Sequence, residues 1–216
     1  MLPPDPARAE FMTADTATTI HVVDDDASFR TALARLLRTE GFAVALHASA
    51  AEFLAAAPYG PGCLLLDVDM PDCNGPELQA QLALRGDVPP IVFLTGKGDI
   101  ASSVKAIKAG AEDYLTKTVE VADLLDALSR ALERDAAARR ARVAAEGLNE
   151  RWARLTPRER QVFDGVVRGL LNKQIAYDLG AAERTIKAHR QQVMTKLGAR
   201  SVPDLVLIAE ALRREV

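Results

Sequence analysis

The feature that most constrains the fold is a run of three leucines at positions 64–66 that ends in Asp67. The run is short and continuously apolar, which is typical of a strand buried on both faces of a parallel sheet. Asp67 would then lie at the carboxyl end of a central strand, where open α/β sheets place their ligands. A buried carboxylate there needs a metal ion, a cation or a chemical role to offset its charge.

Three other apolar runs end in side chains of matching chemistry. They are residues 20–23 before Asp24, Asp25 and Asp26, residues 91–94 before Thr95, and residues 114–116 before Lys117. The carboxyl ends of parallel strands share one edge of a sheet, so these groups can converge on one crevice. Clustered carboxylates repel one another unless a hard cation, most simply Mg²⁺, lies between them. One carboxylate could then take a phosphoryl group as a nucleophile, with lysine and threonine binding its oxygens.

The first part of the chain alternates short apolar runs with helical patterns. We expect strands near 19–24, 42–47, 63–67, 90–95 and 112–116, and helices near 27–40, 50–56, 75–84, 99–109 and from 119 onward. Five such repeats predict an α/β fold, a five-stranded doubly wound parallel sheet with helices on both faces. His21 and His47 fall within strand patterns and are expected to be structural.

Length and charge indicate two domains. Among 216 residues, positions 1–149 hold 14 Lys/Arg against 22 Asp/Glu, and positions 150–216 hold 13 against 8. An acidic part joined to a basic part makes the basic one a candidate for binding a polyanion. Two cysteines, Cys63 and Cys73, are too few for a disulfide framework and fit a cytoplasmic protein. No apolar run approaches the roughly 18 residues of a membrane span, and residues 1–17 read as a disordered extension.

The motifs of the first part resemble the receiver domain of bacterial two-component response regulators, over residues 18–133. The matching residues are Val22-Val23-Asp24-Asp25-Asp26, Asp67 with Met70-Pro71 and Gly75, Thr95-Gly96, and Lys117. The resemblance implies a flavodoxin-like sheet and a phosphoacceptor, Asp67, that receives its phosphoryl group from a sensor histidine kinase. It also implies that Asp25, Asp67 and the Asp69 carbonyl ligate Mg²⁺, that Asp24 assists through water, that Thr95 and Tyr114 form a switch pair, and that Lys117 contacts the phosphoryl group.

One position departs from the receiver pattern. Receivers usually carry proline after the lysine, in a cis bond, whereas this chain has Thr118. A cis bond before threonine would cost roughly 2.5–4 kcal/mol, so we expect a trans peptide and a different placement of Lys117.

Residues 121–146 run almost without glycine or proline, and their apolar residues have helical spacing. We expect a long helix that ends the receiver and continues into a helical linker, residues 134–152. A weak coiled-coil seam through residues 138–155 leaves two interpretations open, a dimer contact and a solvated spacer, of which the spacer is favoured.

The last part carries three helix patterns in succession. Thr156-Pro157 with Glu159 is a helix-start signature, a short helix follows from Asn172 to a stop at Gly180, and a third covers about 183–197 with a basic exposed face. Two short helices at a tight turn, the second of them basic, describe a helix-turn-helix with a recognition helix.

These segments resemble the LuxR-type helix-turn-helix of the FixJ/NarL group of response regulators, and they define an all-α second domain, residues 153–216. The matching motifs are Leu155-Thr156-Pro157-Arg158-Glu159, Asn172-Lys173-Gln174-Ile175-Ala176, Thr185-Ile186-Lys187-Ala188-His189 and Lys196-Leu197-Gly198. Leu171 and Ala182 stand where the family usually has a capping hydroxyl, and Asn172 is expected to replace the first cap. The expected DNA contacts are Lys173, Thr185, Lys187, His189 and Arg190, with Lys173 meeting phosphate and His189 open between a phosphate contact and helix packing.

The two resemblances together imply a transcription regulator, not an enzyme, that dimerises on phosphorylation and has promoter DNA and RNA polymerase as partners, with no membrane partner. Two rival functions remain open. The pair Asp67 and Asp69 resembles the nucleophile pair of haloacid-dehalogenase-type phosphatases, although Asp24 and Asp25 precede it here. A second rival is a DNA-binding protein whose receiver is a passive dimerisation module.

Overall fold

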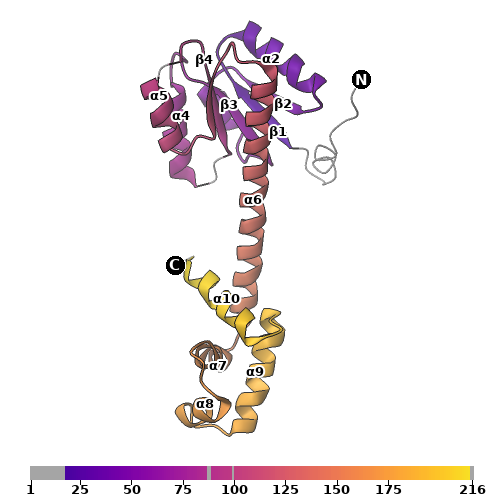
Figure 1. The fold of residues 1–216 in the computed structure, drawn as a ribbon, viewed down its shortest axis with the longest axis vertical. Helices are drawn as coiled ribbons and strands as arrows, with labels where there is room; N and C mark the ends of the chain where they lie inside the picture. Colours follow the sequence, from indigo (N-terminus) through magenta and orange to yellow (C-terminus); the bar gives the residue numbers. More distant parts are fainter. Residues whose placement is uncertain (1–17, 87–88, 99, 215–216) are drawn as a thin grey trace. The chain divides into compact units, whose positions relative to one another are not determined.

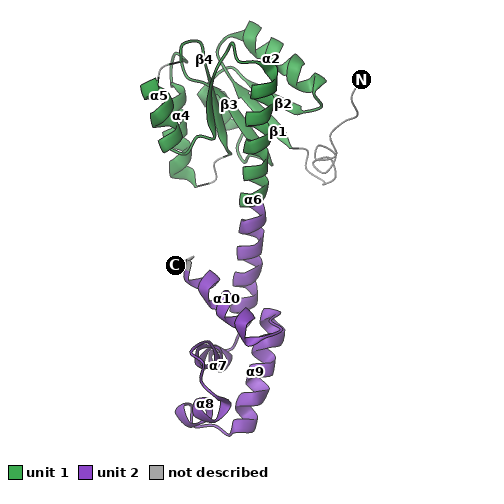
Figure 2. Cartoon of the chain, viewed as in Figure 1, with its two compact units in different colours: residues 1–138 green, residues 139–216 purple. Residues whose placement is uncertain are grey.

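The computed structural model describes residues 18–86, 89–98 and 100–214. It divides into two compact units, residues 1–138 and 139–216 (Figure 2), each with its own hydrophobic core. The disordered extension expected over residues 1–17 lies outside the described residues. Among the described residues, no helix combines the length and the apolar character that a membrane crossing requires.

The first unit is built on one sheet of five parallel strands in the order β2-β1-β3-β4-β5 (Figure 1). The strands are β1 (Thr19–Val23), β2 (Ala43–His47), β3 (Gly62–Asp67), β4 (Ile91–Thr95) and β5 (Asp113–Thr116). Strand β3 pairs with β1 and β4, and all six of its residues are buried. The predicted five-stranded parallel sheet is therefore confirmed, and Asp67 ends its central strand.

Helices cover both faces of this sheet. They are α2 (Ala27–Thr39), α3 (Ala50–Ala55), α4 (Gly75–Arg85), α5 (Ile100–Lys108) and the first part of α6 (Val121–Ala153). Because successive strand side chains point to opposite faces, Cys63 and Leu65 of β3 pack with α2 and α6, whereas Leu64 and Leu66 pack with α3, α4 and α5. This alternation explains why a continuously apolar run is needed at the centre of the sheet.

Side-chain caps start the helices that follow β1, β2 and β3. Asp26 accepts hydrogen bonds from the N–H groups of Ser28 and Phe29 at the start of α2. Ser49 caps α3, and Asn74 forms a capping box with Glu77 at the start of α4. The third acid of the run after β1 is thus used to cap α2, which leaves Asp24 and Asp25 available to the site.

Helix α6 continues beyond residues 121–146 as one helix that passes through Gly147 and ends at Ala153. Glycine inside a helix costs about 1 kcal/mol relative to alanine. Arg151, one turn later, donates from its Nε to the Gly147 carbonyl at 3.0 Å. The expected helical linker, residues 134–152, falls within this single helix.

The second unit contains the last turns of α6 and four further helices. They are α7 (Pro157–Val167), α8 (Asn172–Asp178), α9 (Glu183–Leu197) and α10 (Val202–Arg214). Thr156 and Glu159 form the predicted capping box, with Pro157 at the first helical position of α7. Helix α10 was not predicted, although the sequence carries a signal for it. Ser201 caps the helix, since its Oγ accepts the Asp204 N–H at 3.3 Å. Leu205, Ile208 and Ala209 then follow at helical spacing and pack in the core.

Candidate functional site

Three carboxylates converge at the carboxyl edge of the sheet. Asp67 ends β3, and Asp24 and Asp25 follow β1, the strand beside it. One oxygen from each of the three lies within 4.8 Å of the others. Asp24 and Asp67 are only 2% and 4% exposed, whereas Asp25 is open to solvent. The sheet topology therefore brings together acids that are more than 40 residues apart in the sequence, as the strand-end argument predicted.

Lys117 lies between the two buried carboxylates. Its Nζ is 2.8 Å from Asp67 Oδ2 and 2.7 Å from Asp24 Oδ2. The Lys117 N–H donates to the Thr95 carbonyl at 2.7 Å, which ties the loop after β5 to the end of β4. The cis bonds of the described residues do not include 117–118, so the trans peptide expected before Thr118 is present. Lys117 nevertheless reaches the acid cluster, because its four-carbon stem is long enough to bring the ammonium to Asp67 from this loop.

Burial and charge act on these groups in opposite directions. Burial raises the pKa of the Asp24 carboxyl, and the negative charge of Asp67 adds to the rise while Lys117 and the Asp26 N–H oppose it. For Lys117, burial by itself would lower the pKa of the ammonium, but the contacts with Asp24 and Asp67 outweigh it and the pKa is raised. The site therefore keeps the Lys117 ammonium protonated, and a further cation would stabilise the charged form of the clustered carboxylates beside it.

The two residues of the expected switch pair, Thr95 and Tyr114, differ in their environment. Thr95, at the end of β4, is fully buried, and its hydroxyl donates to the Lys97 carbonyl at 3.0 Å and accepts the Lys97 N–H at 3.2 Å. Tyr114, in β5, is half-buried, and its ring lies 5.9 Å from that of Phe93. The Thr95 hydroxyl is thus held within its own turn, on the strand next to Asp67.

The acid cluster suits a hard divalent cation. Three carboxylates with oxygens inside 4.8 Å offer the ligand type that Mg²⁺ prefers, and the exposed Asp25 leaves one side open to water ligands. Asp69 is exposed, and its N–H donates to Asp67 Oδ1 at 3.3 Å, so its backbone lies beside the cluster. The residues present therefore fit the expected metal.

The sequence did not single out Phe29 as part of this site. Its ring lies under the Lys117 ammonium, with Nζ 4.6 Å from the ring centroid. The only sequence signal is its place in the first turn after the acidic run, because that turn begins beside the carboxyl end of β1.

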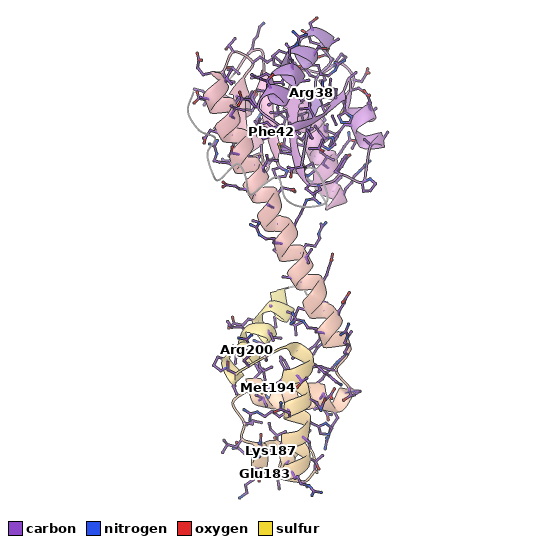
Figure 3. The ribbon with its side chains drawn as sticks, turned by 90° about the vertical axis from the view of Figure 1, so that its right-hand side faces the viewer. Arg38, Phe42, Glu183, Lys187, Met194 and Arg200 are labelled. Carbon is purple, nitrogen blue, oxygen red and sulfur yellow. The ribbon has the colours of Figure 1, made fainter. Side chains whose placement is uncertain are left out.

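The helix-turn-helix of the second unit consists of α8 and α9. Lys173 on α8 and Thr185 and Lys187 on α9 are exposed, as predicted for residues that meet DNA. Figure 3 shows Lys187 one turn after Glu183, at the start of α9. The exposed face of this helix also carries Arg184 and Gln191.

His189 and Arg190 are placed differently, since both are half-buried. The Arg190 Nη1 donates to Asn172 Oδ1 at 3.1 Å, which links α9 to the first residue of α8. We expected Asn172 to replace the missing cap of α8, but it does not. The N-cap is Leu171, whose N–H donates instead to Gln174 Oε1 at 2.8 Å.

A five-stranded parallel sheet with a carboxylate cluster and a lysine at its carboxyl edge, followed by a helix-turn-helix, defines a receiver-type domain joined to a DNA-binding domain. Comparison with known proteins agrees. The response regulator receiver domain matches residues 20–129, and the bacterial regulatory proteins of the luxR family match residues 153–209. The chain belongs to the response regulators of the FixJ/NarL type, which are transcription regulators.

Individual relatives align over most of the chain. The transcriptional regulatory protein FixJ of Azorhizobium caulinodans is 44% identical over 191 residues, which cover 88% of this chain and 90% of that protein. The response regulator protein TodT of Pseudomonas putida is 41% identical, covering 93% and 88%. The solved structure of the response regulator StyR matches with a TM-score of 0.82 at 46% identity, covering 90% of this chain and 99% of that one. Full-length FixJ from B. japonicum matches with a TM-score of 0.56 at 39% identity, covering 91% and 98%.

Proposed function

We propose that Asp67 is the phosphoacceptor of this response regulator and that a sensor histidine kinase supplies the phosphoryl group. An Asp67 carboxylate oxygen attacks phosphorus, the bond from phosphorus to the imidazole nitrogen breaks, and the imidazole leaves as the new acyl phosphate forms. The observation that carries this proposal is that Asp67 ends the central strand with the Lys117 Nζ 2.8 Å from its Oδ2.

The other groups at this edge have distinct roles in the proposal. Asp25, Asp67 and the Asp69 carbonyl would hold Mg²⁺, with Asp24 assisting, and the ion would offset the negative charge of the carboxylates and the phosphoryl group. Lys117 contacts a phosphoryl oxygen. The Thr95 hydroxyl leaves its bond to the Lys97 carbonyl and turns toward the phosphoryl group, and Tyr114 follows it as the second member of the switch.

The output is carried by the rest of the chain. We assign residues 18–133 to the receiver, 134–152 to the helical linker and 153–216 to the DNA-binding domain. Phosphorylation favours a dimer, which presents two copies of α9 to successive half-sites of a promoter. Lys187 and Thr185 meet DNA from the exposed face of α9, Lys173 meets phosphate, and RNA polymerase is the further partner. A regulator that binds the bacterial chromosome works in the cytoplasm.

Labelling with a small phosphodonor tests the acceptor. The full chain is incubated with acetyl phosphate with and without Mg²⁺, and intact-protein and peptide mass spectrometry follow the adduct. We expect one phosphoryl group per chain, on Asp67, that requires Mg²⁺.

The matched control is Asp67→Asn, in which the amide keeps the shape of the side chain but lacks the nucleophilic charge. It should form no adduct while keeping its circular dichroism spectrum. Stoichiometric labelling of the variant would show that another residue is the acceptor. Rapid turnover of acetyl phosphate would favour the phosphatase alternative, and the absence of any adduct on the unaltered chain would favour the passive module.

A further inference from the structure

Among the described residues, the Lys117 ammonium contacts two carboxylates, which change when the site reacts, and one aromatic ring, which does not. The carboxylate of Asp67 becomes an acyl phosphate, and that of Asp24 lies in the cluster that would hold the cation. The third neighbour is the face of the Phe29 ring, 4.6 Å from Nζ. The ring is uncharged, so its attraction for the ammonium persists while the charge on the carboxylates changes.

The Phe29 ring is fixed by contacts that are separate from the chemistry. The Phe29 N–H donates to Asp26 Oδ1 at 3.1 Å, which places the residue in the capped first turn of α2. The side chain is half-buried and packs against the core between α2, α6 and the sheet. The ring is therefore a preorganised platform at the edge of the acid cluster.

The contacts of the loop that carries Lys117 fix its backbone but not the end of the lysine side chain. Its backbone is tied by the Lys117 N–H to the Thr95 carbonyl at 2.7 Å and by the Val119 N–H to the Thr116 carbonyl at 3.0 Å. Thr118 itself is exposed, and its hydroxyl lies 3.2 Å from the exposed Thr116 hydroxyl. None of these contacts fixes the end of the lysine side chain, which has four rotatable bonds beyond the backbone.

We propose that Phe29 is a positioning residue for the phosphorylation of Asp67, because its ring holds the Lys117 ammonium beside the Asp67 carboxylate throughout the reaction. This inference rests on the proposed function of Asp67. Phe29 touches no reacting atom in this scheme and acts through Lys117.

The contact itself is tested first, without phosphorylation. In the full chain with ¹³C-labelled lysine, the ring should shift the ε-methylene protons of Lys117 upfield, with the resonance assigned from Lys117→Ala. The shift should vanish in Phe29→Leu, which keeps an apolar side chain in the core, and return in Phe29→Tyr, which restores a ring. A Lys117 signal without a ring-induced shift in the unaltered chain would overturn the proposal.

The consequence for the reaction is measured as the rate of adduct formation across a range of acetyl phosphate concentrations. Phe29→Leu should lower the maximal rate roughly three- to tenfold, the range expected for a cation–π contact, and Phe29→Tyr should restore it. Phe42→Leu is the matched control, because Phe42 (labelled in Figure 3) packs against the same core but precedes β2, at the amino edge of the sheet, whereas the acid site lies at the carboxyl edge. It should leave the rate unchanged.

A double variant separates positioning from a general structural effect. If Phe29 acts through Lys117, Phe29→Leu should cause no further loss in a Lys117→Ala background. An equal loss in both backgrounds, or a Phe29→Leu chain that reacts at the unaltered rate, would overturn the positioning role alone. An unaltered chain that shows the ring-induced shift but forms no adduct would instead overturn the function proposed for Asp67, and the positioning role with it.

Discussion

At the scale of single residues, the structure distinguishes a lysine and an arginine of α9 that the sequence treats alike. Lys187 is exposed on α9, whereas Arg190 is half-buried and bonded to Asn172 of α8. An arginine that bonds to the neighbouring helix can hold the recognition helix in place, whereas an exposed lysine is available to contact DNA. The two side chains should therefore affect DNA binding by different routes.

Lys187→Ala should weaken DNA binding. If the lysine contacts a base, the free energy of binding to the natural promoter should become less favourable by about 1–3 kcal/mol. If it contacts phosphate, the affinity for all DNA sequences should fall equally. The reason is that its ammonium lies on the exposed face of α9. Gel-shift titrations at two salt concentrations, with specific and random duplexes, distinguish the two cases. Unchanged affinity for both duplexes would contradict the assignment of α9 as the recognition helix.

Arg190→Ala and Asn172→Ala should weaken promoter binding to a similar extent, by about 0.5–1.5 kcal/mol each, because each removes the same hydrogen bond. Their effects should not add in the double variant, whereas Arg190→Ala and Lys187→Ala should be additive. The same titrations measure both cycles. Full additivity of Arg190→Ala with Asn172→Ala would show that Arg190 binds DNA independently of α8.

At the scale of secondary-structure elements, strands β1 and β2 are joined by a buried histidine pair. His21 Nδ1 lies 3.1 Å from His47 Nε2, and the rings stack against each other under Phe53 and Tyr59. Burial lowers the pKa of both imidazoles; the neighbouring His47 lowers that of His21 further, whereas Glu52 partly offsets the effect on His47. A hydrogen bond between two ring nitrogens also requires that one of them carry no proton.

This pair predicts that the receiver loses stability in acid. A histidine whose folded pKa is depressed contributes stability above its unfolded pKa of about 6.5, and that stability falls as the pH drops from there toward the folded pKa. The slope is at most about 1.4 kcal/mol per pH unit for each imidazole. Hydrogen exchange of β1 and β2 amides between pH 7.5 and 5.5, corrected for intrinsic rates, measures it.

The control for this pH dependence is His47→Gln, which removes one titrating group and should flatten the slope. Trp152, the single tryptophan, lies in the second unit, so its fluorescence monitors that unit separately. An equal slope in the variant would show that other groups set the acid sensitivity of the sheet.

Two glycines in helices should respond to alanine in opposite ways. A Cβ at Gly147 meets no atom within 4 Å, so Gly147→Ala should stabilise α6 by about 0.5–1 kcal/mol. A Cβ at Gly165 would lie 2.8 Å from Ile175 Cγ1, so Gly165→Ala should destabilise the second unit by about 1–3 kcal/mol. Trp152 fluorescence in urea follows the second unit, and hydrogen exchange over residues 143–151 follows the helix. Stabilisation by Gly165→Ala would show that Ile175 yields without cost.

At the scale of the whole molecule, the proposed function requires that phosphorylation at one sheet edge change how two chains associate. The face made by α5, β5 and α6 carries Val104, Lys105 and Lys108, and Ile100, Val104 and Ile107 expose apolar surface along α5. Tyr114 lies in β5, which pairs with β4, the strand that ends in Thr95. A change in Thr95 and Tyr114 can therefore alter this surface.

Phosphorylation with acetyl phosphate should shift the chain from monomer toward dimer, because the modified state favours pairing through this face. Light scattering at high occupancy of Asp67 measures the shift, with Asp67→Asn as the control that stays monomeric. Val104→Lys should weaken the dimer without reducing the adduct, since it adds like charge to a paired surface. A monomer that persists at full occupancy would contradict dimerisation as the output.

The strands, most helices and the acid cluster could be predicted from sequence because their signals are local. Apolar runs of strand length, helical spacing and cap residues each depend on near neighbours, and parallel topology sends every strand end to one edge. Asp24, Asp25, Asp67 and Lys117 could therefore be grouped without coordinates. Helix α10 escaped prediction even though its cap and spacing are also local.

Tertiary structure alone decided the contacts between distant segments. Lys117 reaches Asp67 from a trans peptide, its ammonium lies over Phe29, and Arg190 bonds to Asn172. Such contacts depend on side-chain rotamers and on the relative placement of packed elements, for which a period of 2 or 3.6 residues carries no signal. The sequence by itself determined which elements form and which acids share the sheet edge; packing determined which neighbours hold each charged group in place.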